Sequence, residues 1–138
     1  MEYAAVKDAM KSCPGLTELD DATLAELLWI AKDKTLLRGR TLYKQGEAAD
    51  GSFCILVAGS LNVFVDGQMV ADVWPPLLLG ESAFATTAHT RGATLQVSSD
   101  SATILEVRPS EDLLGRLSKM FSEMAWDRWL MVTRLAPS

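Results

Sequence analysis

Apolar residues near the start of the chain recur at intervals of three and four, which predicts one buried face of a helix. Those residues are Leu24, Leu27, Leu28 and Ala31. Asp20 is suited to cap the N-terminus of this helix, and Asp21 in the first turn favours the helix dipole. Lys32 and Lys34 are expected near its C-terminal end. We therefore predict a helical N-terminal part that covers residues 1–34.

Between residues 35 and 108 the pattern changes to short runs rich in β-branched and aromatic residues, separated by turn residues. The expected strands are Leu36–Tyr43, Phe53–Val57, Ser60–Val65, Gln68–Val73, Thr94–Val97 and Thr103–Val107. Asp66-Gly67 joins two of these runs and is a strong signal for a two-residue hairpin. Many short strands at regular spacing predict a mainly β fold. We expect a double-stranded β-helix, that is, a jelly-roll-like β-roll with flanking helices.

A second helix is predicted over residues 109–138. Ser110 can cap its N-terminus, and Glu111 and Asp112 place two acids in the first turn. The whole chain has 138 residues, the size of one domain. The predicted organisation is one domain in the order helix, β-roll, helix.

The charge balance limits the partners of this domain. Thirteen basic and eighteen acidic residues give a formal net charge of −5, which opposes binding to nucleic acid but permits a local pocket for one phosphate. We see neither a signal peptide nor an apolar stretch long enough to span a membrane, so the expected location is the cytoplasm. Without a secretory context, Cys13 and Cys54 are expected as reduced thiols, Cys54 in the core.

One segment combines residues suited to binding a small phosphodiester. Gly80-Glu81 opens a run of small residues that includes Ser82 and Ala83. If a short helical turn forms there, its first N–H groups have no internal partners and can bind an anion. Small side chains allow the phosphate to approach the backbone closely.

Arg91 stands directly before a predicted strand and adds a planar fork of donors that matches two phosphate oxygens. Glu81 repels a phosphate, but its carboxylate can accept a hydrogen bond from a ribose 2′-hydroxyl and can steady Arg91. The segment therefore suits a ligand that carries both a phosphate and a ribose.

At these residues the chain resembles the cyclic nucleotide-binding domain family, which includes bacterial catabolite activator proteins, protein kinase A regulatory subunits and nucleotide-gated channels. The family's phosphate-binding cassette opens with Gly-Glu and closes with Arg, a small residue and Ala or Thr. The matching residues are Gly80-Glu81 and Arg91-Gly92-Ala93-Thr94. Three further segments match in order: Leu42–Glu47, Phe53–Ser60 and Val65–Gly67. The similarity extends from about Leu16 to about Leu117.

The resemblance implies a role for each cassette residue. Arg91 would pair with the cyclic phosphate and Glu81 with the ribose 2′-hydroxyl, and backbone amides would complete the anion site. The implied ligand-binding residues are Gly80, Glu81, Ser82, Ala83, Arg91, Gly92 and Ala93. Gly92 favours cAMP over cGMP, because family members that prefer cGMP often have threonine at this position.

The resemblance also implies a non-catalytic sensor whose C-terminal helix closes over the base and relays the signal to a separate effector protein or domain. Phe121, Trp126 and Trp129 are candidate lid residues, although the same side chains can instead pack on the roll or form a homodimer. Apart from the nucleotide, no cofactor or metal is expected. A metal-dependent cupin-like enzyme is disfavoured, since His89 is the sole histidine. The alternative is a degenerate roll that binds no nucleotide and serves as a dimerisation or protein-interaction module.

Overall fold

The computed structural model contains two antiparallel β-sheets and describes residues 3–13, 16, 19–80 and 90–117. One four-stranded sheet has the order β1-β8-β3-β6, and the other has the order β2-β7-β4-β5. In the first sheet the strands are β1 (Lys32–Leu37), β8 (Ser101–Val107), β3 (Phe53–Ala58) and β6 (Leu77–Leu79). In the second they are β2 (Thr41–Tyr43), β7 (Thr94–Val97), β4 (Leu61–Val65) and β5 (Gln68–Val73). The predicted β-roll is confirmed.

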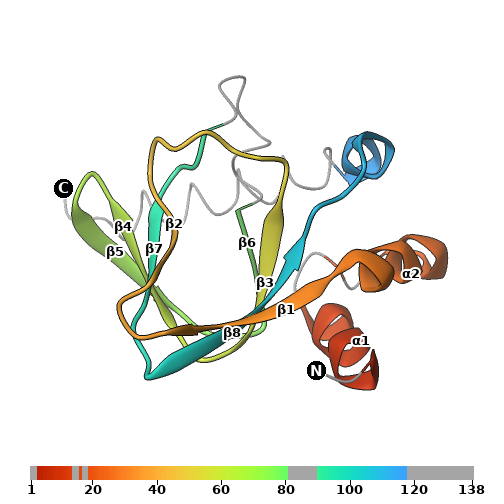
Figure 1. The fold of residues 1–138 in the computed structure, drawn as a ribbon, viewed down its shortest axis with the longest axis horizontal. Helices are drawn as coiled ribbons and strands as arrows, with labels where there is room; N and C mark the ends of the chain where they lie inside the picture. Colours follow the sequence, from red (N-terminus) through yellow and green to blue (C-terminus); the bar gives the residue numbers. More distant parts are fainter. Residues whose placement is uncertain (1–2, 14–15, 17–18, 81–89, 118–138) are drawn as a thin grey trace.

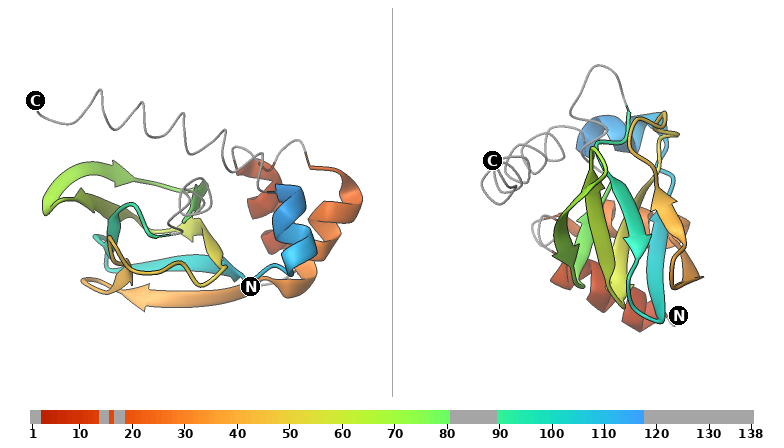
Figure 2. Two further views of the ribbon diagram at one scale, coloured as in Figure 1. Left: turned by 90° about the horizontal axis from the view of Figure 1, so that it is seen from above. Right: turned by 90° about the vertical axis from the view of Figure 1, so that its left-hand side faces the viewer.

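The helices lie together at one end of the roll. They are α1 (Tyr3–Ser12), α2 (Asp21–Ile30) and a helix at residues 111–117. Figures 1 and 2 show all three beside the end of the roll where β1 begins and β8 ends. None of the helices in the described residues is long and apolar enough to cross a membrane.

β3 explains how the core is divided. Its residues alternate between two buried clusters, because successive side chains of a strand point to opposite faces. Phe53 and Ile55 join the cluster that contains the helices, whereas Cys54 and Leu56 join the cluster inside the roll. Other members of the first cluster are Met10, Cys13, Leu16, Leu24, Leu27, Leu105, Leu113 and Leu117. Burial of both faces accounts for the continuous apolar run in this strand.

The predicted extension of the first helix to residue 34 was wrong. α2 begins after its expected cap, where the Thr23 N–H donates to Asp20 Oδ1 (2.8 Å), but it ends at Ile30, and Ala31 is already extended. The chain then continues as β1, where Lys34 Nζ donates to Glu106 Oε2 on β8 (2.9 Å). β1 is exposed at all but one position. A strand with so little burial does not need alternating apolar and polar residues, and its sequence therefore lacks the pattern that predicts a strand.

The expected single strand Leu36–Tyr43 was also wrong, since the structure divides it between the two sheets. Gly39 has a φ of +86°, which favours glycine, and the Arg40 N–H donates to Leu37 O (3.1 Å) to close a turn. β1 ends before this turn, and β2 follows it. The sequence pattern places both segments in the extended conformation but does not assign them to sheets.

Two local predictions are confirmed. Asp66 and Gly67 have φ values of 52° and 80°, as a type I′ hairpin turn between β4 and β5 requires. The Leu113 N–H donates to Ser110 Oγ (3.2 Å), so Ser110 caps the helix at residues 111–117. The remainder of the predicted C-terminal helix lies outside the described residues.

Candidate functional site

The backbone of Arg91 is bonded to the turn that follows β2. Its N–H donates to Glu47 O (2.8 Å), and its carbonyl accepts from the Gly46 N–H (2.9 Å). These bonds hold Arg91 beside the segment 44–52, which joins β2 to β3. The chain enters β7 three residues after Arg91. The arginine therefore projects from a position fixed at both its amide and its carbonyl.

The guanidinium of Arg91 is buried, with only 4% of the residue exposed. Nη1 donates to Gly80 O (3.1 Å), directly after β6. Nη2 donates to Asp50 Oδ1 (3.1 Å) and to Ser52 O (3.0 Å). The structure thus brings together the two ends of the predicted cassette, Gly80 and Arg91, and adds two partners that we did not predict.

Tyr43 forms the floor beneath the arginine. The Arg91 Cζ atom lies 3.8 Å from the centroid of the Tyr43 ring, a cation–π distance, and the ring is itself buried. The Tyr43 hydroxyl and Cys54 Sγ are 3.0 Å apart. Burial raises the pKa values of both groups, that of Cys54 to about 11, so the thiol is neutral near pH 7 and is a poor nucleophile.

Gly80 is required by its backbone and by its neighbours. Its φ is +88°, and a Cβ placed there would lie 2.8 Å from both Arg91 Nη1 and Tyr43 Cε2. A larger residue would therefore require the Arg91 guanidinium or the Tyr43 ring to shift. The glycine that we predicted from the cassette pattern has a structural reason that is independent of any ligand.

Asp50 links the buried arginine to a second one. Oδ1 accepts from Arg91 and from the backbone N–H of Ser52 (3.0 Å), while Oδ2 accepts from Arg108 Nη2 (2.9 Å). Burial opposes ionisation of Asp50, but the Ser52 hydrogen bonds and the two arginines outweigh it and lower its pKa to about 2. The carboxylate is therefore charged throughout the physiological range.

Of the other predicted site residues, Gly92 is exposed, and Ala93 is partly buried against the core inside the roll. Six lie outside the described residues: Glu81, Ser82, Ala83, Phe121, Trp126 and Trp129.

Sequence reasoning missed Tyr43, Asp50 and Ser52. No local signal in the sequence points to these residues, because their contacts with Arg91 join positions about 40 or more residues apart.

The described part of the site is a cluster of charged and polar groups around Arg91. No group of three or more potential metal ligands occurs among the described residues. A separate groove between α2 and residues 110–113 is lined mainly by apolar side chains, including Trp29 and Leu113, and does not include Arg91. The Arg91 fork beside Gly80, paired with Asp50, is thus separate from this groove.

Comparison with known proteins agrees with the β-roll fold. The sequence profile described as the cyclic nucleotide-binding domain matches residues 33–114, well over half of the chain. The chain belongs to the cyclic nucleotide-binding domain family. The matched segment contains both sheets except for Lys32, the first residue of β1, and it includes the turn after β2 and Arg91. No curated protein sequence is significantly similar to the chain.

Solved structures share the fold. The chain superposes on cAMP-bound PfPKA-R with a TM-score of 0.79 and 17% identity, covering 96% of this chain and 45% of the other. For the regulatory domain of Toxoplasma gondii PKA with cAMP the TM-score is 0.71 and the identity is 21%, over 94% of this chain and 48% of the other. For the regulatory subunit of a cAMP-independent protein kinase A from Trypanosoma cruzi bound to guanosine the TM-score is 0.73 and the identity is 13%, over 94% of this chain and 44% of the other. The chain therefore spans less than half of each of these proteins.

Proposed function

We propose that this domain binds cAMP and acts as a regulatory sensor without catalysing a reaction on the nucleotide. Arg91 would pair with the cyclic phosphate, and the amides that follow Gly80 would complete the anion site. The observation that carries the proposal is the buried guanidinium of Arg91, held beside Gly80 at the opening of the cassette. A charge-assisted hydrogen bond contributes about 1.5–3 kcal/mol, so one arginine and a few amides are sufficient for micromolar binding.

The choice of cAMP has two supports. PfPKA-R and the Toxoplasma gondii domain, which share this fold, are described with cAMP bound. In addition, Gly92 provides no hydroxyl of the kind that family members favouring cGMP often place there. Glu81 would accept a hydrogen bond from the ribose 2′-hydroxyl.

Isothermal titration of the parent chain with cAMP and cGMP tests the proposal. We expect saturable binding of cAMP, with a dissociation constant in the micromolar range and weaker binding of cGMP. Arg91→Lys retains the positive charge but loses the planar fork, and should weaken cAMP binding by at least about tenfold. Arg38→Lys is the matched control, because Arg38 also pairs with an aspartate but lies at the surface, and should leave the affinity unchanged. Absence of heat and of thermal stabilisation at millimolar nucleotide would reject the proposal.

The ribose contact has its own test. Glu81→Gln removes the charge but keeps the shape of the side chain, and should weaken cAMP binding while leaving the affinity for 2′-deoxy-cAMP nearly unchanged. An equal loss for both ligands would assign Glu81 a role other than recognition of the 2′-hydroxyl.

A second candidate function is favoured by the partners of Arg91. Its Nη1 and Nη2 atoms already donate to protein acceptors on Gly80, Asp50 and Ser52, so both ends of the fork have partners without a ligand. The same roll would then be a scaffold for dimerisation or for another protein. Nucleotide-independent dimerisation that is lost in Trp129→Glu, together with no heat from cAMP, cGMP or guanosine, would support this second function.

In the first function the signal would leave through the C-terminal helix. Binding shifts an equilibrium only if the ligand contacts two states differently. Phe121, Trp126 and Trp129 would cover the base, and the helix would reach a second copy of the chain or a separate effector in the cytoplasm. A change in tryptophan fluorescence on cAMP addition that is lost in the double variant Trp126→Phe/Trp129→Phe is the expected result.

A further inference from the structure

Asp50 places a negative charge beside the proposed phosphate position. The Arg91 Nη2 atom that donates to Asp50 belongs to the guanidinium that would receive the phosphodiester. An anion bound to this fork would therefore lie close to the Asp50 carboxylate, and like charges at such separations repel. The described site needs a way to offset this repulsion.

Arg108 is placed to offset it. Its Nη2 donates to Asp50 Oδ2 (2.9 Å), the carboxylate oxygen that does not contact Arg91. Arg108 is 60% exposed at its side chain and Asp50 is 49% exposed, so both can rearrange without unpacking the core. The two arginines thus share one carboxylate, and their cluster with Asp50 carries a net positive charge.

Among the described residues Arg108 has one further charged neighbour, Glu106, which leaves it available for this role. Arg108 Nε lies 3.6 Å from Glu106 Oε1, but the other oxygen of Glu106 accepts from Lys34 Nζ at 2.9 Å. Glu106 is therefore neutralised largely by Lys34. Ser52 contributes hydrogen bonds to Asp50 but no charge.

We propose that Arg108 is a positioning residue of the anion site: it holds and neutralises Asp50, so that Arg91 can accept a phosphodiester. This inference rests on the proposed nucleotide binding and adds a residue outside the cassette to it. Arg108 directly follows β8 and stands two residues before Ser110, the cap of the helix at residues 111–117. The charge that supports the anion site is thus located where the roll joins the C-terminal helix.

A double-mutant cycle tests the role of Arg108. The affinity for cAMP is measured by titration for the parent, Arg108→Gln, Asp50→Asn and the double variant, and the melting temperature of each confirms folding. Arg108→Gln should weaken binding about five- to tenfold in the parent, because Asp50 then repels the ligand. In the Asp50→Asn background the same change should alter the affinity less than about twofold.

Two further measurements separate this electrostatic role from a merely structural one. Arg108→Lys restores the charge and should return the affinity to within about twofold of the parent. Raising the salt concentration from about 50 mM to about 500 mM should reduce the difference between the parent and Arg108→Gln, because exposed charges are screened. Arg38→Gln, at an exposed pair remote in sequence, should have no effect on affinity.

The outcomes distinguish this inference from the proposed function. If the parent binds cAMP and Arg108→Gln binds equally well, or loses affinity equally in both backgrounds, the role of Arg108 is refuted and nucleotide binding stands. If no variant binds a nucleotide, the proposed function fails, and the role of Arg108 fails with it.

Discussion

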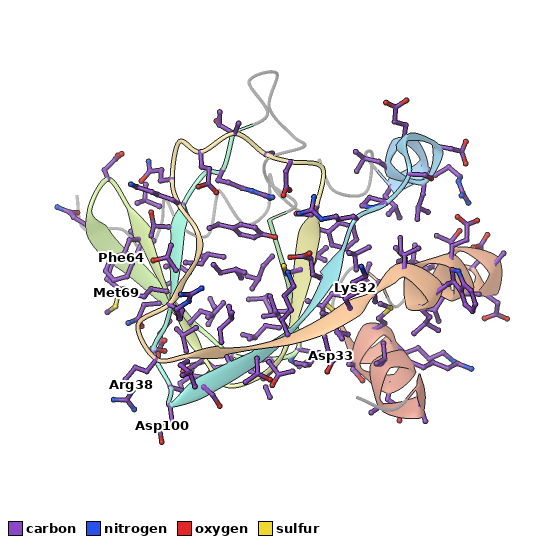
Figure 3. The ribbon with its side chains drawn as sticks, viewed as in Figure 1. Lys32, Asp33, Arg38, Phe64, Met69 and Asp100 are labelled. Atoms are coloured by element: carbon purple, nitrogen blue, oxygen red, sulfur yellow. The ribbon has the colours of Figure 1, made fainter. Side chains whose placement is uncertain are left out.

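Two arginine–aspartate pairs of similar length lie in very different surroundings. Arg91 Nη2 and Asp50 Oδ1 are 3.1 Å apart, and the arginine side chain is 4% exposed. Arg38 Nη2 and Asp100 Oδ1 are 2.7 Å apart, but their side chains are 65% and 98% exposed. Figure 3 labels Arg38 and Asp100 at the outer corner where β1 ends and β8 begins, pointing away from the roll.

The comparison shows that distance alone does not indicate the importance of an ion pair. A fully solvated pair contributes little to stability, because water competes and ordering two long side chains costs entropy. A buried guanidinium must have every donor matched, since an unpaired buried charge is costly. Both terminal nitrogens of Arg91 donate to buried or partly buried acceptors, which lie on three residues: Gly80, Asp50 and Ser52. The shorter pair is therefore expected to matter less, and the following predictions test that contrast.

The largest effect is expected for Arg91→Ala. The change leaves Gly80 O and Ser52 O without their buried donor and exposes the face of Tyr43, so we expect a loss of about 3 kcal/mol in the free energy of unfolding. Urea denaturation without nucleotide measures it. A loss below about 1 kcal/mol would place Arg91 in the same class as Arg38.

The next effect is expected for Gly80→Ala, compared with Gly39→Ala. Both glycines have φ near +87°, but the space around Gly39 is open, whereas a Cβ at Gly80 meets Arg91 and Tyr43 at 2.8 Å. Gly39→Ala should cost about 1 kcal/mol from backbone strain alone. Gly80→Ala should cost about 1–2 kcal/mol more, because the stack of Arg91 on Tyr43 must shift. Equal losses in the free energy of unfolding, measured by urea denaturation, would show that the Arg91–Tyr43 stack can shift at no cost.

A smaller effect is expected from the titration of Asp50. Its folded-state pKa of about 2 lies below the ordinary value of 3.8. Its contribution to stability is therefore complete above about pH 4 and is lost as the pH falls toward 2. Because the carboxylate is half exposed, we expect only about 1 kcal/mol. The stability difference between the parent and Asp50→Asn, followed by urea denaturation from about pH 6 to about pH 2.5, should shrink by more than half of this amount; a constant difference would contradict it.

The smallest effect is expected for Arg38→Ala, which removes the exposed arginine–aspartate pair. Removing a solvated partner of Asp100 should change the free energy of unfolding by less than about 0.5 kcal/mol. Denaturation in urea at low salt is the most sensitive measurement, since salt screens such pairs. A loss comparable to that of Arg91→Ala would remove the distinction between the two pairs.

The amino-acid sequence was sufficient wherever structure depends on near neighbours. The caps at Asp20 and Ser110 act over three residues, and the Asp66-Gly67 turn needs only positive φ at two adjacent positions. The buried run in β3 was equally visible, because burial on both faces requires successive apolar residues. The family motif, Gly80-Glu81 followed by Arg91, was also recognisable from the sequence alone.

The tertiary structure alone decided which residues complete the site and which sheet each strand joins. Asp50 and Arg91 are 41 positions apart, and nothing local to either residue indicates that they meet. Tyr43 lies beneath Arg91 because β2 and β7 pair in one sheet. Lys32 and Lys34 lie on a strand because the segment that contains them pairs with β8. Such contacts depend on the packing of distant segments, and their free energy exists only once the roll has closed.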